Sequence, residues 1–222
     1  MRTISIAAVG LVVSMLVASD ATAQWNVARF DTSPNRVHTG FGLDPALVTT
    51  VGYSRVLSLV GHRLQLSGDV GIAAANLDTH DFRARVQVLT SIVRWRSLYL
   101  NGSVTSITRG TENSIYRGLN FGADFTANAG VYRRGWFAAG EFGFDKAVVT
   151  HLTHSDWYRQ YFYPEARDGW YLDAGGTFHY GLVGGITIGR AEVCGRGGVL
   201  RTENFNGLMP SFYAGLGVGL GF

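Results

Sequence analysis

The residues best suited to chemistry in this chain lie close together, between Thr150 and Asp156. His151, His154, Ser155 and Asp156 all fall in this short segment. A serine, a histidine and an aspartate can act as nucleophile, general base and orienting group in hydrolysis. His154 and Ser155 are adjacent, however, so on an extended strand their side chains point to opposite faces. The segment is a candidate catalytic site, and a structured loop is the simpler interpretation.

The same residues are candidates for a metal site. Imidazole and carboxylate groups suit several divalent ions, so His151, His154 and Asp156 are the residues to consider. The two imidazoles would face one another only if the segment were helical. The chain has no HExxH motif, no CxxC pair, no glycine-rich phosphate loop and no nucleotide-binding fingerprint. We therefore expect neither a bound metal nor a cofactor, and we favour a protein that is not an enzyme.

A second group of charged residues occurs where polar and apolar side chains alternate. If the alternating segments close into a narrow barrel, these charges face its interior. They could pair across the interior and fill it, or they could tune the selectivity of a narrow pore. The predicted interior charges are Arg83, Arg85, Asp69, Asp124, Glu141, Asp145 and Asp173.

Period-two alternation, which is typical of strands with one apolar face, recurs in ten segments. In the third segment, Leu64, Leu66 and Val70 alternate with Gln65 and Asp69. Residues 184–194 fit the pattern least well. The predicted strands are 36–43, 47–57, 63–74, 83–93, 98–108, 116–127, 136–146, 169–178, 184–194 and 211–222.

The connections between these segments alternate between short and long. Short connections are predicted at 58–62, 94–97, 129–135 and 179–183, and the longest at 147–168 and 195–210. Short turns at one end and long loops at the other are typical of transmembrane β-barrels, and an even strand number places both termini at the same end. Because the connection at Asp44-Pro45 is unusually tight, eight strands are the alternative to ten.

The composition of the polar face favours a barrel with polar side chains inside. Gly, Ser, Thr, Asn and Gln dominate that face, whereas a soluble lipocalin-like barrel would present Lys and Glu to water. Lipid cannot satisfy the hydrogen bonds of an open sheet edge, so a sheet in a membrane must close. We predict an all-β protein, a single antiparallel up-and-down transmembrane β-barrel. Aromatic residues near the strand ends, where Trp and Tyr favour the membrane interface, are Trp95, Tyr99, Tyr132, Trp136, Trp170, Tyr171, Tyr180, Tyr213 and Phe222.

The C-terminal segment alternates apolar residues with glycine and ends at Phe222. It resembles the C-terminal strand of bacterial outer-membrane β-barrels, in which a terminal Phe resembles the signal that the barrel assembly machinery reads. The run from His151 through Gly175-Gly176 to Tyr180-Gly181 resembles an uncharacterised family of small Gram-negative outer-membrane barrels. This resemblance implies a fold and a location, and no activity.

Residues 1–23 have the features of a secretory signal peptide. Arg2 supplies a positive charge, Ile4–Ala18 is an uncharged apolar run, and Ala21-Thr22-Ala23 is a small-x-small cleavage site. The apolar run is shorter than the roughly 20 residues that a spanning helix needs, and an uncleaved anchor is the alternative. The predicted barrel domain is therefore residues 24–222.

The composition agrees with a location in the cell envelope. Only 16% of the residues are charged, against about 25% in typical soluble proteins. Lys146 is the only lysine. A GC-rich genome is the simpler explanation, and the functional one is that arginine suits the phosphate and carboxylate groups of lipopolysaccharide. The arginines are scattered along the sequence, the net charge is only +3, and no nucleic-acid motif is present, so we expect no nucleic-acid partner. We expect a monomer whose partners are outer-membrane lipid, lipopolysaccharide and the barrel assembly machinery.

Three classes of function remain open. A narrow porin-like channel or a structural envelope protein requires no further machinery and is preferred. A lipid A-modifying hydrolase is suggested by a partial resemblance to lipid A deacylases, in which a His and a Ser lie two residues apart. Here His154 and Ser155 are adjacent, and His151 is followed two positions later by Thr153. The third class is a surface-binding barrel that uses the aromatic loop 157–171, which could otherwise fold as a cap over the barrel mouth.

Overall fold

A computed structural model describes residues 24–44, 46–59, 61–73, 80–173 and 175–222. The predicted signal peptide 1–23 and Pro45 lie outside these ranges. The described residues form strands almost throughout, and none of their helices is long and apolar enough to cross a membrane. The elements are η1 (Val27–Arg29), β1 (Asn35–Asp44), β2 (Ala46–Leu59), β3 (His62–Ala73), β4 (Phe82–Trp95), β5 (Leu98–Glu112), β6 (Tyr116–Arg133), β7 (Trp136–His154), α2 (Asp156–Tyr161), β8 (Gly169–Leu172), β9 (Thr177–Ile188), β10 (Ala191–Thr202) and β11 (Gly207–Gly221).

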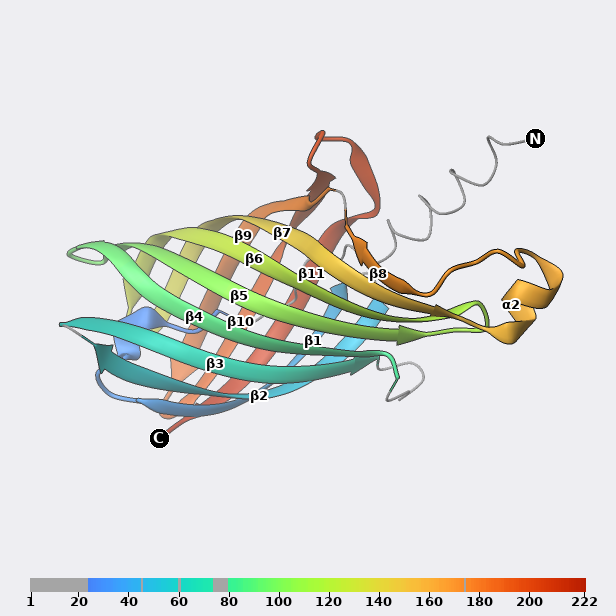
Figure 1. The fold of residues 1–222 in the computed structure, drawn as a ribbon. Helices are drawn as coiled ribbons and strands as arrows, with labels where there is room; N and C mark the ends of the chain where they lie inside the picture. The colour runs from blue at the N-terminus through green and yellow to red at the C-terminus, as the bar shows by residue number, and fades with distance from the viewer. Residues whose placement is uncertain (1–23, 45, 60, 74–79, 174) are drawn as a thin grey trace.

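Ten of these strands close into an antiparallel up-and-down barrel (Figure 1). Neighbours in sequence pair with one another, β7 pairs with β9, and β1 pairs with β11 from Arg36↔Gly221 to Leu43↔Ala214. The short strand β8 adds only to the outer part of β7, where Val149 pairs with Leu172. The prediction of an all-β antiparallel up-and-down barrel with ten strands is confirmed, and the alternative of eight strands is not.

Two of the predicted strands were misplaced. The predicted strand 184–194 runs through a tight turn, because Ile188 pairs with Ala191 and Gly189 adopts a positive φ of 61°. The predicted strand 169–178 covers β8 and only the first residues of β9. The predicted short connection at 179–183 is therefore wrong, since these residues lie within β9. The weak alternation around residue 190 marks the turn.

The end of the barrel that carries the long loops, here called the outer end, also differs from the prediction. Strand β7 continues to His154, so the predicted connection 147–168 begins well inside a strand. The real loop contains α2. Figure 1 shows α2 after the end of β7 that lies opposite the β6–β7 turn, beyond the ends of the other strands. The long hairpin therefore carries α2 outward, and α2 does not form the expected cap over the mouth.

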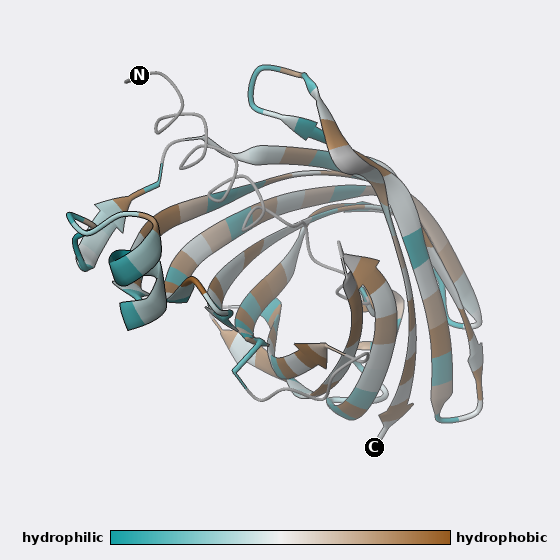
Figure 2. Ribbon diagram, turned by 90° about the vertical axis from the view of Figure 1, so that its right-hand side faces the viewer, coloured by the Kyte–Doolittle hydropathy of each residue, from teal (hydrophilic) through white to brown (hydrophobic). Residues whose placement is uncertain are grey.

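The strands place polar side chains inside the barrel and apolar side chains outside. In β3, Gln65, Ser67 and Asp69 are buried, whereas Leu66 and Val70 are 42% and 53% exposed. The same alternation of hydropathy runs along the other strands (Figure 2). This arrangement is the reverse of a soluble protein, which buries its large apolar side chains.

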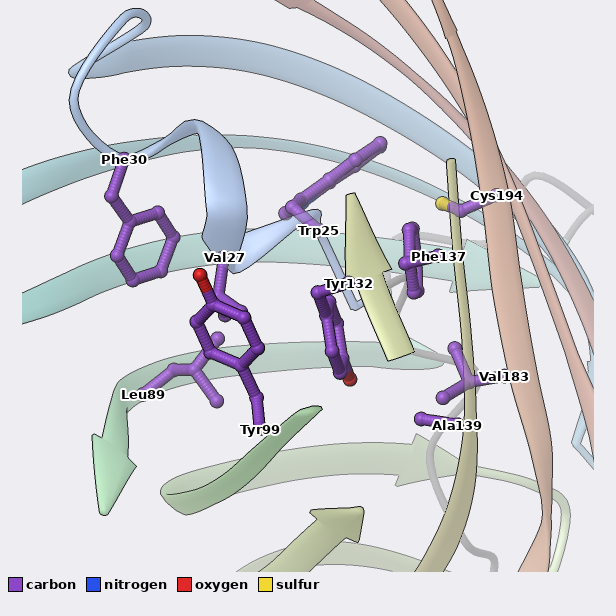
Figure 3. Close-up of a cluster of buried hydrophobic side chains, with 10 residues drawn as sticks. All are labelled: Trp25, Val27, Phe30, Leu89, Tyr99, Tyr132, Phe137, Ala139, Val183 and Cys194. Atoms are coloured by element: carbon purple, nitrogen blue, oxygen red, sulfur yellow. The ribbon is translucent and has the colours of Figure 1, made fainter. Parts of the chain in front are cut away.

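The segment before β1, residues 24–34, fills the end of the barrel where the short turns lie. We call it the N-terminal plug. Trp25 and Phe30 are 2% and 7% exposed. Figure 3 shows Trp25, Val27 and Phe30 facing side chains from the barrel wall. The buried cluster comprises Trp25, Val27, Phe30, Leu89, Tyr99, Tyr132, Phe137, Ala139, Val183 and Cys194.

Polar contacts hold the plug in place. The Asn26 side chain accepts a hydrogen bond from Ala28 N at 3.0 Å, which caps η1. The Asn26 N–H donates to Glu192 Oε1 at 2.6 Å, and its Nδ2 donates to the Arg133 carbonyl at 2.6 Å. Asn26 therefore joins η1 to both β10 and the β6–β7 turn.

Replacing Trp25 by Ala should destabilise the barrel. The indole is buried among wall side chains, and truncation of a buried Trp costs about 3–5 kcal/mol because a cavity remains. Urea unfolding of the folded protein in detergent would measure this loss. W157A is the matched control, because Trp157 is 49% exposed and contacts rings of its own loop. Equal losses in the two variants would contradict the role of the plug.

Candidate functional site

A network of buried polar side chains occupies the barrel interior, and Glu141 on β7 is at its centre. Arg196 on β10 donates a hydrogen bond to Glu141 Oε1, and the Tyr213 hydroxyl on β11 donates to the same oxygen at 2.9 Å. Arg196 also lies over the Tyr213 ring, 4.9 Å from its centroid. Glu141 is 6% exposed, so water contributes little to stabilising its charge. The guanidinium and the hydroxyl provide that stabilisation.

His179 on β9 links this group to a second carboxylate. Its Nε2 lies 2.7 Å from Asp124 Oδ2, and its Nδ1 lies 3.5 Å from Glu141 Oε1. The Thr126 hydroxyl donates to Asp124 Oδ1 at 2.6 Å. These contacts skip a strand, because β6 and β9 are separated by β7 in the wall. The network therefore ties together five strands, β6, β7, β9, β10 and β11.

Separate ion pairs continue along the interior. Arg85 Nε donates to Asp69 Oδ1 at 2.7 Å, between β4 and β3. Arg109 on β5 pairs with Asp145 on β7 and also donates to Asn120 Oδ1 at 3.2 Å. Buried ion pairs of this kind are costly to break, because the remaining charge is left without water.

Toward the end of the barrel with the long loops, neutral groups and one carboxylate form a cluster on β6, β7 and the residue after β8. Asn120 Nδ2 donates to Thr150 Oγ1 at 2.7 Å and to Asp173 Oδ2 at 2.9 Å. The Thr150 hydroxyl donates to the same Asp173 oxygen at 2.5 Å. Asn120 and Thr150 are each 1% exposed, so this cluster is buried against the wall.

The seven predicted interior charges occupy different positions in this arrangement. Asp69, Arg85, Asp124, Glu141 and Asp145 are buried inside the barrel. Asp173 lies at the outer end, as described above, and Arg83 is half-buried. Arg83 and Arg85 line a cavity of about 10 Å³, which has room for little more than one water molecule.

Sequence reasoning missed several interior residues for identifiable reasons. Arg109 lies one residue beyond the predicted strand 98–108. His179 was assigned to a turn that does not exist. Glu192 falls in the predicted strand 184–194, where an unbroken period of two would put it on the face of Ile186. The turn at 189–190 pairs Ile186 with Val193 instead, so Glu192 faces inward. The alternation of Glu192, Cys194 and Arg196 after Gly189 was the available signal.

The predicted catalytic segment lies outside the barrel interior, where β7 leaves the wall. His151 packs edge-on against Trp170 of β8, with ring centroids 4.9 Å apart. The Ser155 hydroxyl is the N-cap of α2: it accepts from Tyr158 N at 3.1 Å and donates to the Ser114 carbonyl at 2.6 Å. Within the described residues, no hydrogen bond joins His154 to Ser155. The structure therefore gives Ser155 a capping position.

His154 instead forms a cluster with a carboxylate from the other side of the loop. Asp168 Oδ1 accepts from the His154 N–H at 2.8 Å and lies 3.2 Å from His154 Nδ1, while Asp168 Oδ2 pairs with Arg159. The hydrogen bond from Arg159 holds the pKa of Asp168 well below its ordinary value, and the same bond raises the pKa of Arg159. We call these three residues the loop clasp, because they join the two ends of the α2 loop.

Asp156 takes no part in the loop clasp. It lies in the first turn of α2, where a negative charge interacts favourably with the helix dipole. In the ranges that the structure describes, no group of three or more His, Cys, Asp or Glu residues is placed to hold a metal ion. The candidate set of His151, His154 and Asp156 is therefore not brought together.

The aromatic loop 157–171 presents its rings to the outside. Trp157 packs against Phe162 with centroids 4.9 Å apart, and Tyr158 stacks on His154 at 5.6 Å. These ring contacts order the loop, but many faces remain uncovered. The exposed aromatic residues of the loop are Trp157, Tyr161, Phe162, Tyr163, Trp170 and Tyr171.

Replacing Glu141 by Gln should destabilise the barrel by about 3 kcal/mol or more, because Arg196 then stays buried without its carboxylate. The double variant E141Q/R196M should recover part of this loss, since no buried charge is left unpaired. Urea unfolding of the two single variants and the double variant forms the test. E165Q is the control, because Glu165 is exposed. Strictly additive losses would contradict coupling between Glu141 and Arg196.

The loop clasp should resist acid. Because the pKa of Asp168 is lowered, its carboxylate keeps its charge below the ordinary value of 3.8, and the clasp is lost only as the pH falls well below that. Hydrogen exchange of the α2 peptide, measured from neutral pH down to pH values below that of an ordinary Asp, would follow it. D168N should increase exchange at every pH, and E165Q should not. A loop that opens near the ordinary Asp pKa in the wild type would disprove this.

Comparison with known proteins gives no family assignment. No protein-family model matches the chain, and comparison with curated proteins found no match either. The functional interpretation therefore rests on two features of the geometry, the packed polar interior of the barrel and the outer hairpin with its aromatic loop.

Proposed function

We propose that this chain is an outer-membrane β-barrel with a closed interior, and that it serves as a structural protein of the Gram-negative cell envelope. The observation that carries the proposal is the reversed distribution of polarity, with charges inside and large apolar side chains outside. Charged interiors need an enclosing wall, and apolar exteriors need lipid.

The outer wall supports the membrane location. Its apolar side chains come from all around the barrel, and in water so large an exposed apolar surface would cause aggregation. They include Val37, Phe41, Val51, Leu57, Leu66, Val70, Val86, Val88, Val104, Phe125, Phe142, Leu182, Ile186, Val193, Leu216, Val218 and Leu220.

The predicted interface aromatics divide into two groups. Trp95, Trp136 and Phe222 are 64%, 43% and 55% exposed, and Trp170, Tyr171 and Tyr180 are exposed as well. Such positions suit rings at the membrane surface. Tyr99, Tyr132 and Tyr213 are buried and point inward, so for these three the interface assignment is wrong.

The closed interior supports a structural role over an open pore. The N-terminal plug fills the turn end, and the Glu141 network and the Arg109–Asp145 pair cross the middle. Asn101, Asn128 and Asp145, which would line a channel, are each at most 2% exposed. A narrow porin-like channel would require at least one of these layers to move.

The other parts of the proposal follow from the two chain ends and the loops. Cleavage after Ala23 would deliver the chain to the envelope as a protein of residues 24–222. The terminal strand with Phe222 would be recognised by the barrel assembly machinery. The long loops would face lipopolysaccharide at the cell surface. The hydrolase alternative is the weakest, because the Ser155 hydroxyl caps α2 and donates its proton to the Ser114 carbonyl, with no hydrogen bond to His154 among the described residues.

The surface-binding alternative is favoured by one observation, the exposed rings of the aromatic loop. Trp157 and Tyr161 are 49% and 65% exposed on α2. Such rings could contact a partner at the cell surface. If the loop has this function, it adds to the structural role of the barrel.

Purified protein of residues 24–222, refolded into detergent, should migrate differently on gels before and after boiling, because a closed barrel resists the detergent of the gel. In a planar lipid bilayer it should give no discrete channel steps, because its interior is packed. Reproducible steps would show an open pore and would replace the structural role with transport. Mobility unchanged by boiling would count against the membrane barrel itself.

A further inference from the structure

Exposed arginines gather at the end of the barrel where the short turns lie, although they are scattered in the sequence. Each of the four turns there carries at least one of them. Arg96, Arg134 and Arg190 lie in the turns themselves, and the others lie in the adjoining strand ends. These turn-end arginines are Arg63, Arg94, Arg96, Arg133, Arg134 and Arg190.

Few acidic groups balance them. Among the described residues, Asp31 pairs with Arg63, and Glu192 is buried and pairs with Arg36 at 3.1 Å. No ion pair is found for the five other turn-end arginines in the part of the chain that the structure describes. These five arginines are exposed, so their guanidinium groups can interact with groups outside the barrel.

Aromatic rings contact three of these arginines, two of them beside the apolar outer wall. Arg96 lies 5.6 Å from the Trp95 ring centroid, and Arg133 lies 5.8 Å from that of Trp136. Both rings are exposed on the outer wall. Arg94 lies over Tyr99 at 5.2 Å, on the inner side of the rim. A guanidinium stacked on a ring keeps its N–H groups free to donate in the ring plane.

The opposite end of the barrel has a different charge pattern. There, Arg159 pairs with Asp168, and Arg117 Nε lies 3.7 Å from Glu112 Oε2. Two arginines at this end are therefore paired with carboxylates, and other acidic side chains, among them Glu165 and Glu203, are exposed there. The excess of positive charge is therefore specific to the turn end.

We infer that the turn-end arginines bind the phosphate groups of anionic phospholipids in the leaflet where the short turns lie. The inference rests on the proposed membrane location and identifies the lipid partner of one end of the barrel. Arginine donates two parallel hydrogen bonds to phosphate, which a choline headgroup shields with its own positive charge. Basic residues beside a membrane attract anionic lipid in this way.

The position of the arginines favours a lipid over a soluble polyanion. The turns are short, so the guanidiniums stay close to exposed apolar residues of the wall such as Leu98 and Ile188. Side chains at this level reach the headgroup layer while their apolar stems contact acyl chains. Lipopolysaccharide would contact the long loops at the other end.

The test is native mass spectrometry. The barrel in neutral detergent is mixed with phosphatidylglycerol or with phosphatidylcholine, the two lipids having the same acyl chains, and the lipid retained after release from the detergent is measured. The wild type should retain phosphatidylglycerol preferentially. R96Q/R134Q/R190Q removes one arginine from each of three turns and should lower this preference roughly tenfold or more. The control variant R117Q/R167Q/R201Q removes three arginines from the opposite end and should retain the preference for phosphatidylglycerol.

Three results would overturn the inference: no preference in the wild type, full preference in the turn variant, or tighter binding of soluble polyphosphate than of the lipid. Inorganic phosphate at the same concentration should displace little lipid, because acyl contacts add to headgroup binding. All three proteins are first inserted into phosphatidylcholine vesicles. Failure of the wild type to insert would count against the proposed membrane barrel, whereas insertion without lipid preference would count only against this inference.

Discussion

Closure of the hydrogen-bonded sheet on itself is the constraint on which the other features depend. The first strand of the wall meets the last, from Arg36↔Gly221 to Leu43↔Ala214, and this pairing leaves the wall without an open edge. Closure separates an inside from an outside, and the period of two then assigns every side chain to one of them. The polar side chains inside the barrel can be stable because the same wall excludes lipid and lets them bond to one another.

The interior shows how charges can be buried in such a barrel. Glu141, Arg196 and His179 each come from a different strand, and each has a partner on a strand that is not its neighbour in the wall: Glu141 pairs with Arg196, and His179 pairs with Asp124. Their contacts act as braces across the curvature of the sheet. Small residues permit the close approach of the strands: a Cβ on Gly181 would lie 2.2 Å from the Gly197 carbonyl oxygen. Close packing of the strands and ion pairs across the interior therefore both favour a narrow barrel.

Much of this architecture could be predicted from the sequence, because alternation is a local signal. The first seven strands were found close to their observed positions, but their ends were not, since Arg109 and His151 continue ladders that no local pattern marks. The failure at residues 184–194 has a clear cause. A turn of two residues, Gly189 and Arg190, moves the outward-facing positions from even numbers (Ile186 and Ile188) to odd numbers (Ala191 and Val193), so the whole segment looks like one strand with weak alternation.

The candidate sites were less predictable, because they depend on which strands become neighbours. The partnership of Asp124 with His179 spans residues far apart in the sequence, and composition gives no hint of it. Ser155 looked like a nucleophile, but its hydroxyl caps α2 through Tyr158 N and donates to the Ser114 carbonyl, which lies on another loop. The gathering of arginines at one end also follows from the topology, since alternate connections meet there.

The N-terminal plug has a consequence for the order of assembly. Its side chains contact residues of strands from β4 to β10, so they lie on the inside of a wall that ends only at β11. A segment of this kind cannot be added to a finished barrel as readily as a loop can. We expect it to be enclosed while the strands curl around it, with Trp25 and Phe30 acting as an internal template. The earliest residues of the described chain would then guide the curvature that allows the last strand to find the first.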